Sequence, residues 1–214
     1  MSAATAEKPL RSDARRNREQ LVASARELLA SEGVDVSVDE ITRHAGLGMG
    51  TLYRHFPTKE ELVDAVLEDA FAELVQLAEQ AAAAEDAWAG LTGFMEQALA
   101  SHAANRGLKD VLATQEHGAR RRAMRERIQP LLRKVVERAQ AQGALRPDFT
   151  AEDLSLVFWA VGRVIQTTAD IAPEQWRRHL GFLLDGLRAS AATPLPVPAL
   201  TRRQLARAAR RKEL

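Results

Sequence analysis

The chain has 214 residues, enough for two small domains or one of medium size, and its 46% hydrophobic and 28% charged residues predict a globular fold with a packed core. The absence of cysteine excludes disulfides and thiolate metal sites, and no apolar run approaches the roughly 20 residues that span a bilayer. Because the N-terminus also lacks the apolar core of a signal peptide, we expect a cytoplasmic protein. The formal net charge is only +1, so affinity for nucleic acid would have to come from the local placement of charge.

The first part of the chain predicts three helices. Residues 1–11 are expected to form a flexible arm, and Ser12 is a plausible N-cap for a helix to about residue 30. The sequence SVDE at 37–40 has the spacing of a capping box and begins a short helix to about residue 44. A turn with glycine leads to a second short helix at 49–55. Together these elements predict a helix-turn-helix domain over 12–57.

The rest of the chain also predicts helices, and we find no strand pattern. The expected helices lie at 58–84, 86–105, 108–115, 119–142, 150–171 and 173–191. The first of them begins at a second capping box, TKEE, and Thr150 caps a later one. Pro130 should kink or interrupt its helix, whereas Pro173 suits a first helical turn. We therefore expect a second helical domain over 58–192, followed at 193–214 by a proline-rich linker and a basic tail, either a short helix or frayed.

The stretch AGLGMGTLYRHFPTKEEL at 45–62 holds three alternating glycines, Gly46, Gly48 and Gly50. A phosphate-binding nucleotide loop would follow a buried strand, but these glycines follow a capped helix, and the Walker lysine with its Ser/Thr is missing. The glycines instead remove side-chain bulk at the turn and at the start of the next helix. The backbone can then approach another surface closely.

Residues 15–66 resemble, without gaps, the N-terminal domain of TetR-family transcriptional regulators. Within them, GTLYRHFPTKEEL matches the signature G(T/S)LYxHFxxKEEL, which is highly specific to this family. The remaining chain resembles the family's usual layout of helices, and the proline-rich linker with its basic end resembles a subgroup with an SbtR-like C-terminal domain. The resemblance implies an all-α fold: an N-terminal three-helix helix-turn-helix domain and a C-terminal helical domain for ligand binding and dimerisation.

The second helix of a helix-turn-helix presents its N-terminal residues to base edges in the major groove. In the family, the residues that match Tyr53 and Lys59 usually contact phosphates. Alternatives stay open for several of these residues: Tyr53 contacts a phosphate or packs as an aromatic, His55 contacts a base or is a surface residue, and Arg43 and Arg54 contact DNA or are merely solvated. The arginine-rich arm either faces solvent or follows the DNA. The expected DNA-binding residues are Arg15, Arg16, Thr42, Arg43, Met49, Gly50, Thr51, Tyr53, Arg54, His55 and Lys59.

Two apolar stripes at helical spacing lie near the end of the chain. One alternative is that they pair across the two-fold axis of the homodimer that the resemblance implies. The other is that they bury against the chain's own helices, and we expect different faces to do each. The candidate interface residues are Phe158, Val161, Ile165, Leu180, Leu183, Leu184 and Leu187.

The resemblance also implies a pocket for an unknown small molecule. Apolar residues at helical spacing are usually core, whereas polar residues in apolar helices need partners if they are buried. Arg163 would pair with an anionic ligand, or with Asp170 or Glu174. The candidate pocket residues are Trp88, Met95, Leu99, His102, Gln115, Met124, Trp159, Arg163 and Gln166.

No catalytic motif is evident, and His102 with His117 lacks a third metal ligand, so we expect no enzyme activity, metal or cofactor. The basic segment 119–134 is interpreted as a solvated helix face rather than a surface for membrane or nucleic acid. The terminal RRQLARAARRK either adds phosphate contacts or packs across the dimer.

The expected protein is a homodimeric repressor, released from a palindromic DNA operator by a small molecule. The alternative is a DNA-binding dimer that is controlled by a protein partner or does not respond to ligand.

Overall fold

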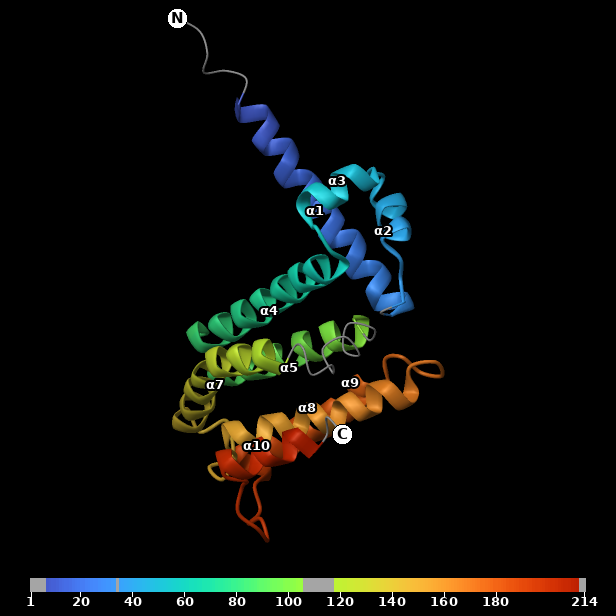
Figure 1. Cartoon of the computed structure of the whole chain (residues 1–214). Helices are drawn as coiled ribbons and strands as arrows, with labels where there is room; N and C mark the ends of the chain where they lie inside the picture. Colours follow the sequence, from blue (N-terminus) through green and yellow to red (C-terminus); the bar gives the residue numbers. More distant parts are fainter. Residues whose placement is uncertain (1–6, 34, 106–117, 212–214) are drawn as a thin grey trace, which may run out of the picture. The chain divides into compact units, whose positions relative to one another are not determined.

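The computed structural model describes residues 7–33, 35–105 and 118–211, and helices account for most of them (Figure 1). Within these ranges there is no strand, only an isolated antiparallel bridge between Leu145 and Arg188. The expected all-helical fold is therefore confirmed. The helices are α1 (Glu7–Glu32), α2 (Val38–Ala45), α3 (Met49–His55), α4 (Lys59–Ala83), α5 (Ala87–Ala104), α7 (Gly118–Ala141), α8 (Ala151–Thr168), α9 (Gln175–Leu187) and α10 (Arg202–Arg211), with a 3-10 turn, η2, at Ala189–Ala191.

The described chain divides into two compact units, one within Met1–Phe71 and Asn105–Val111, the other within Ala72–Ala104 and Leu112–Leu214. Helix α4 contributes to both units, since the division falls inside it. Its first turns carry Leu62, which is fully buried. This explains why the first unit extends beyond the helix-turn-helix itself. No helix of the described residues is long and apolar enough to cross a membrane.

Helix α1 begins earlier than the sequence predicts. It begins at Glu7, so Ser12 lies inside the helix and is not its N-cap. The arm expected over 1–11 is thus helical from residue 7 onward, and residues 1–6 lie outside the described ranges. Pro9 permits this start because the first backbone N–H groups of a helix have no intrahelical acceptor, so a missing N–H there costs nothing.

The capping box at Ser37 and the cap at Thr150 are confirmed, and Thr150 also forms a complete box, whereas at Thr58 the described chain shows only the bond from the Glu61 N–H. Ser37 donates its backbone N–H to Glu40 Oε2 (2.8 Å), and Glu40 donates its own N–H to Ser37 Oγ (3.2 Å). Thr150 and Asp153 make the same exchange at the start of α8, with distances of 2.8 and 3.3 Å. These reciprocal bonds satisfy donors that a helix N-terminus leaves open, so they determine where α2 and α8 begin.

Other boundaries differ from the prediction. Helix α9 begins at Gln175, so Pro173 precedes the helix instead of occupying its first turn, and α9 ends at Leu187. Pro130 lies inside α7, which continues through it. The short helix expected at 108–115 lies outside the described residues.

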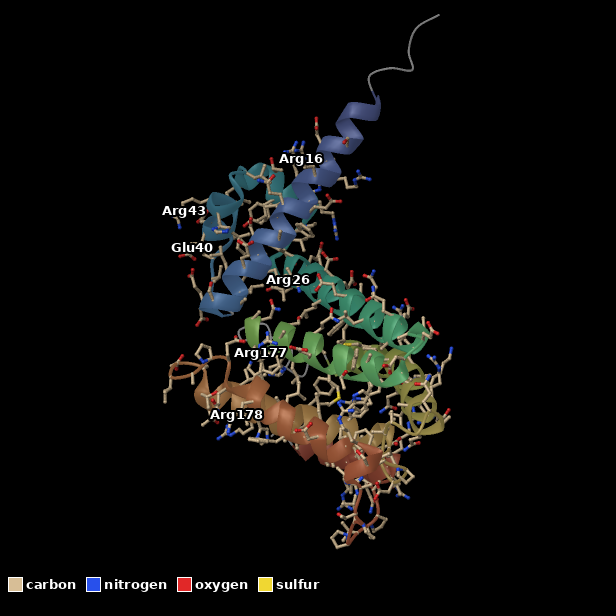
Figure 2. All side chains as sticks on the ribbon, turned by 180° about the vertical axis from the view of Figure 1, so that it is seen from behind. Arg16, Arg26, Glu40, Arg43, Arg177 and Arg178 are labelled. Atoms are coloured by element: carbon tan, nitrogen blue, oxygen red, sulfur yellow. The ribbon has the colours of Figure 1, made fainter. Side chains whose placement is uncertain are left out.

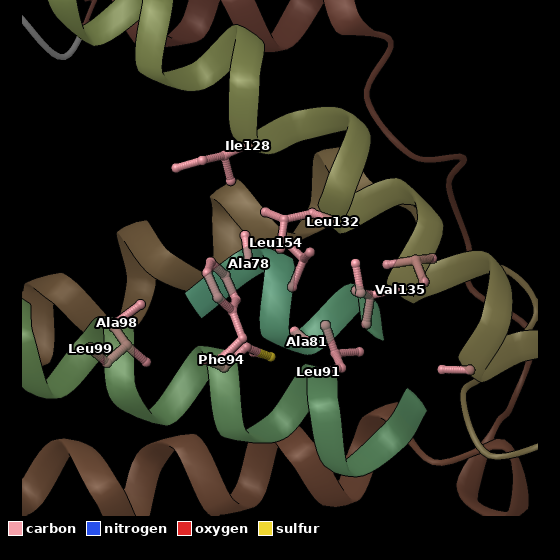
Figure 3. Close-up of a cluster of buried hydrophobic side chains, with 14 of the residues drawn as sticks. Ala78, Ala81, Leu91, Phe94, Ala98, Leu99, Ile128, Leu132, Val135 and Leu154 are labelled. Carbon is pink, nitrogen blue, oxygen red and sulfur yellow. The ribbon is translucent and has the colours of Figure 1, made fainter. Parts of the chain in front are cut away.

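The core of the second unit lies between α4, α5, α7, α8 and α9. Trp176 of α9 is its largest fully buried side chain, with only 1% exposed. The close-up in Figure 3 shows side chains of four of these helices converging, so that the second half of α4 is part of this core. The labelled residues are Ala78, Ala81, Leu91, Phe94, Ala98, Leu99, Ile128, Leu132, Val135 and Leu154.

Side chains at the end of α7 and just after it hold the corner between α4 and α5. Arg138 donates from Nη1 to the carbonyl of Ala82 (2.9 Å) and from Nη2 to that of Ala84 (2.7 Å). Gln142 Oε1 accepts the backbone N–H of Ala87 at 2.9 Å. The last carbonyls of a helix lack intrahelical donors, so the Arg138 guanidinium supplies hydrogen-bond donors to the carbonyls at the end of α4.

A second arginine joins three segments farther along the chain. Arg146 is only 8% exposed. Its Nε donates to Asp148 Oδ1 (2.6 Å), its Nη1 to the carbonyl of Gly186 (3.1 Å) and its Nη2 to that of Thr193 (2.6 Å). The hydrogen bond from Arg146 holds the pKa of the Asp148 carboxyl below its ordinary value. Arg146 thereby ties the segment between α7 and α8 to the end of α9 and to the start of the linker.

Candidate nucleic-acid interface

The turn between α2 and α3 depends on one glycine. Gly46 caps α2 with φ 64° and ψ 26°, a left-handed conformation that residues with a Cβ rarely adopt. Its N–H donates to the carbonyl of Arg43 (3.2 Å), and the N–H of Leu47 donates to that of Thr42 (3.0 Å). Gly48 then returns to extended backbone and becomes the N-cap of α3. This sharp turn is the helix-turn-helix geometry that the sequence predicts.

Helix α3 is anchored by apolar contacts on one side. Leu52 is fully buried, and Phe56, the residue after the helix, is 3% exposed. The guanidinium of Arg18 on α1 lies 5.2 Å from the centre of the Phe56 ring. Gln20, also on α1, donates from Nε2 to the carbonyl of Ala45 (2.6 Å). Helix α1 therefore holds both short helices in place.

The opposite side of α3 is open. Tyr53 is 48% exposed, Arg54 and Gly50 are exposed, and Thr51 is half-buried. A Cβ added at Gly48 or Gly50 would meet no atom of the chain within 4 Å, and neither residue has a positive φ. The fold itself therefore requires glycine at neither position. Their effect is to leave backbone uncovered at the start of α3.

Two of the expected contact residues point into the protein. Thr42 is 4% exposed and its hydroxyl donates to the carbonyl of Asp39 (3.0 Å), so the expectation of a DNA contact from this side chain is corrected. Met49 is half-buried, with its sulfur 3.5 Å from the Thr42 hydroxyl, and it rests on α2. His55 is half-buried as well, and its Nε2 has no hydrogen-bond partner among the described residues. Thr51 and Arg54 remain the candidates for contact with base edges.

Three exposed arginines of α1 differ in what they contact. Arg15 is exposed, with its Nε 3.6 Å from Glu19 Oε1, and Arg16 is exposed as well (Figure 2). Arg18 instead covers the Phe56 ring, as described above. Surface ion pairs such as Arg15–Glu19 contribute little to stability, so they leave the arginine able to exchange partners.

Positive charge also gathers between α2 and the start of α4. The pKa of the Glu40 carboxyl is lowered, first by the hydrogen bonds from Ser37 and further by the charges of Arg43 and Lys59. Both cations therefore lie close enough to act on one carboxylate. Lys59 follows Thr58, whose Oγ1 caps α4 by accepting the N–H of Glu61 (3.2 Å).

The predicted pocket residues differ in how far they are exposed. Met95 and Leu99 are fully buried in the core, whereas Arg163 and Gln166 are exposed on α8. Trp88 is half-buried, with the guanidinium of Arg188 4.9 Å from its ring centre.

The other pocket candidates that the structure describes, Met124, Trp159 and His102, are all half-buried. His102 lies against α8, where its ring would be 3.5 Å from a Cβ added at Gly162. Gln115 lies outside the described residues.

The predicted interface residues mostly face inward. Val161, Ile165 and Leu180 are at most 3% exposed. Leu183, Leu184 and Leu187 are half-buried against the same core, and Phe158 packs edge-on to Phe94, with ring centres 6.0 Å apart. For these stripes the second of the two alternatives holds within the described chain.

Sequence reasoning missed Phe182, which is 61% exposed. It lies on the side of α9 away from the core, and the guanidinium of Arg178 lies over its ring, 4.9 Å from the ring centre. The sequence does contain a signal for it. Phe182 falls outside the helical period of Leu180, Leu183 and Leu187, which places a large aromatic residue on the polar face of the helix.

Comparisons with known proteins agree with this geometry. Residues 21–66 match the bacterial regulatory proteins of the tetR family, and residues 85–189 match the C-terminal domain of SbtR-like transcriptional regulators. The TetR transcription regulatory protein of Mycobacterium vanbaalenii is 34% identical, with a TM-score of 0.66, over 84% of this chain and 99% of that one. A TetR transcriptional regulator of Streptomyces coelicolor is 28% identical, with a TM-score of 0.65, over 80% of this chain and 98% of that one.

Curated relatives share mainly the DNA-binding part. An HTH-type transcriptional regulator of Staphylococcus aureus is 42% identical over 60 residues, which is 28% of this chain and 32% of the relative. The similarity thus spans about a third of the length of such relatives. With both halves matched and a solved relative similar over nearly its whole length, the chain belongs to the TetR family of bacterial transcriptional regulators: it is a DNA-binding protein and not an enzyme.

Proposed function

We propose that this regulator is a homodimeric repressor that binds a palindromic operator and is released from it by a small molecule. The observation that carries the proposal is the small open face of α3. A helix of seven residues with two side chains open to base edges offers one copy few specific contacts. A two-fold dimer doubles these contacts and gives the operator its symmetry. Since its target is bacterial DNA, its place of action is the cytoplasm.

The DNA contacts divide by role. Thr51 and Arg54 read base edges, because both lie on the open side of α3. Tyr53 and Lys59 hold phosphates, the first by its phenol and the second by its charge. With so few base contacts, the shape of the operator contributes to specificity. The proposed interface comprises Arg15, Arg16, Arg43, Gly50, Thr51, Tyr53, Arg54 and Lys59, with His55 at its edge.

The dimer forms through the outward faces of α8 and α9. Phe182 supports this, because an aromatic ring that is 61% exposed loses most of its contact with water at an interface. On α8, Leu156 and Trp159 are half-buried and do not share the helical period of the buried Val161 and Ile165. These residues replace the inward-facing stripes as the proposed interface.

Two modes of control fit the second unit. The SbtR-like match supports a regulatory domain, and release by a small molecule is the proposed mode. Met95 and Leu99, however, are fully buried within the packed core. That packing favours the second candidate, a dimer that is controlled by a protein partner or does not respond to ligand.

Selection of bound fragments from random and genomic DNA, at a stated salt concentration, tests the proposal. We expect enrichment of one palindrome and a protein–DNA complex of two chains per site. Genes beside the enriched sites then supply candidate ligands for release assays. Binding without enrichment, or enrichment of an asymmetric site by a single chain, would contradict the proposal.

The phosphate contacts have their own test. The double variant Tyr53→Phe, Lys59→Ala should weaken binding to all DNA sequences alike, and should reduce the slope of log K against log salt by about 1, because one cation no longer displaces counterions. Titrations at several salt concentrations measure both effects. Lys134→Ala on α7, which also removes one lysine, here an exposed one, is the control. An unchanged slope would remove Lys59 from the phosphate contacts.

A further inference from the structure

Helices α7 and α10 together line a surface cavity of about 180 Å³. The cavity belongs to the second unit and not to the unit that contains α3. Helix α10 also lies beyond residue 189, where the match to the SbtR-like C-terminal domain ends. The lining residues are Arg125, Glu126 and Gln129 of α7 and Arg202, Leu205 and Ala206 of α10.

Helix α10 is an ordered element of the fold, not a frayed tail. Thr201 donates its N–H to Gln204 Oε1 (2.9 Å), and Gln204 donates its own N–H back to Thr201 Oγ1 (3.3 Å), which closes a capping box. Leu205 is 4% exposed and Ala209 is 8% exposed. The helix is therefore docked by its apolar side, and this docking places Arg202 at the cavity.

Positive charge predominates around this cavity. Among the side chains that the structure describes, α7 from residue 123 to Pro130 holds two arginines and one glutamate, and α10 up to Ala209 holds three arginines and no acid. Within the described part of the chain, neither Arg125 nor Arg202 forms an ion pair or hydrogen bond. Two guanidinium groups near one cavity repel each other, and an anion bound between them would attract both and offset that repulsion.

We propose that this cavity binds a phosphate group, carried either by a small molecule or by a nucleic-acid backbone. The planar guanidinium fork matches the geometry of phosphate oxygens, and Arg125 and Arg202 approach the cavity from two different helices. Gln129 adds an amide donor, while Leu205 and Ala206 form an apolar wall for the carbon of a phosphate ester. Glu126 opposes binding with a single negative charge and so limits the affinity.

The site is independent of operator recognition by α3. Its test uses the full-length protein and two probes at matched ionic strength: inorganic pyrophosphate, and a short DNA duplex without the operator. Isothermal titration measures binding, and thermal unfolding measures stabilisation against a chloride control. Three variants probe the lining: the double variant Arg125→Gln, Arg202→Gln; Glu126→Gln; and Arg203→Gln, which removes an exposed arginine of α10 outside the lining.

The proposal predicts saturable binding that the double variant weakens by about tenfold or more, because two charge-assisted hydrogen-bonding groups are lost. Glu126→Gln should strengthen binding, and Arg203→Gln should leave it nearly unchanged. This pattern with pyrophosphate identifies a free phosphorylated molecule as the ligand. The same pattern with the duplex alone identifies the nucleic-acid backbone.

Other outcomes overturn the proposal. Absence of saturable binding to both probes would do so. So would equal losses in the double variant and in Arg203→Gln, because binding would then follow overall charge and not the cavity. The Glu126→Gln variant keeps the test decisive if the double variant is poorly folded, since a weaker or unchanged affinity there also contradicts the site.

Discussion

At the scale of single residues, the glycines around α3 divide by what requires them. Gly46 adopts a left-handed backbone conformation that closes the turn, so its reason lies within the fold. Gly48 and Gly50 have neither a positive φ nor a neighbour within reach of an added Cβ. We therefore infer that glycine at these positions serves a surface outside the chain that approaches the backbone closely.

Gly50→Ala separates these two kinds of requirement. The free energy of unfolding should stay unchanged or rise by up to about 1 kcal/mol, because alanine favours helix over glycine. Operator binding should weaken by about tenfold, or about 1.4 kcal/mol, because the methyl group separates the helix from DNA. Thermal unfolding and DNA titration measure the two effects. Gly93→Ala on α5, where the nearest atom lies 3.9 Å from an added Cβ, is the control that should leave DNA binding alone.

The sequence predicts which residues carry the DNA-binding motif, but not all of their orientations. Tyr53 and Arg54 are exposed, as a contact role requires. Thr42 is turned inward by a hydrogen bond to Asp39 and by the sulfur of Met49, seven residues away. Such a contact depends on the angle between α2 and α3, which no local pattern encodes.

At the scale of elements, capping chemistry was the most reliable guide. The boxes at Ser37 and Thr150 mark the starts of α2 and α8 because each cap needs only residues within one turn. Ser12 failed as a cap, since Pro9 allows α1 to begin earlier. Pro173 fits a first turn equally well by local rules, yet α9 begins after it. Where several local starts are compatible, the local sequence alone does not determine which one the helix uses.

The capping box of α2 should make stability depend on pH. The pKa of Glu40 is lowered from its ordinary 4.5 by its bonds with Ser37, so its contribution is complete above about pH 4.5 and is lost as the pH falls through the folded value. The loss of unfolding free energy caused by Glu40→Gln should therefore be largest near neutral pH and shrink in acid. Denaturant unfolding from about pH 7 to 3 measures it. Glu79→Gln on the exposed side of α4 is the control; an equal pH trend there would contradict the assignment.

Leu52 is the one fully buried side chain of α3 and anchors the helix to the first unit. Leu52→Ala should lower the free energy of unfolding by about 2–5 kcal/mol, because the removed methyl groups leave a cavity beneath the helix. DNA binding should fall with it. Leu52→Met keeps most of the volume and should cost less than about 1.5 kcal/mol. Urea unfolding of the three proteins checks this, and equal stability of all three would show that α3 is held by other contacts.

At the scale of the whole molecule, apolar stripes do not say which surface covers them. Val161 and Leu180 lie in stripes that suited an interface or a core equally well, and they proved to be core. The decision needs the position of α5 beside α8 and α9, which is set by residues far apart in the sequence. Phe182 could be found only as an exception to the pattern.

The proposed dimer yields a test at this scale. Phe182→Glu should raise the dimer dissociation constant roughly thirtyfold, about 2 kcal/mol, since a buried aromatic is replaced by a charge. Analytical ultracentrifugation over a range of concentrations measures the change. Val197→Glu, at a linker residue that is 70% exposed, should leave the dimer intact. If both variants stay equally dimeric, the interface lies elsewhere than on α9.

The bonds from Arg138 and Gln142 to the corner after α4 also determine where the chain can be divided. A fragment that stops at the end of α4 would keep Ala78 and Ala81 without the core that covers them, and Ala82 would lose the guanidinium that binds its carbonyl. A fragment that ends near Phe71 avoids both losses and keeps the turns of α4 that belong to the first unit. To isolate the DNA-reading half, or to graft it onto another sensor, the cut belongs in the middle of a continuous helix and not at the loop that follows it.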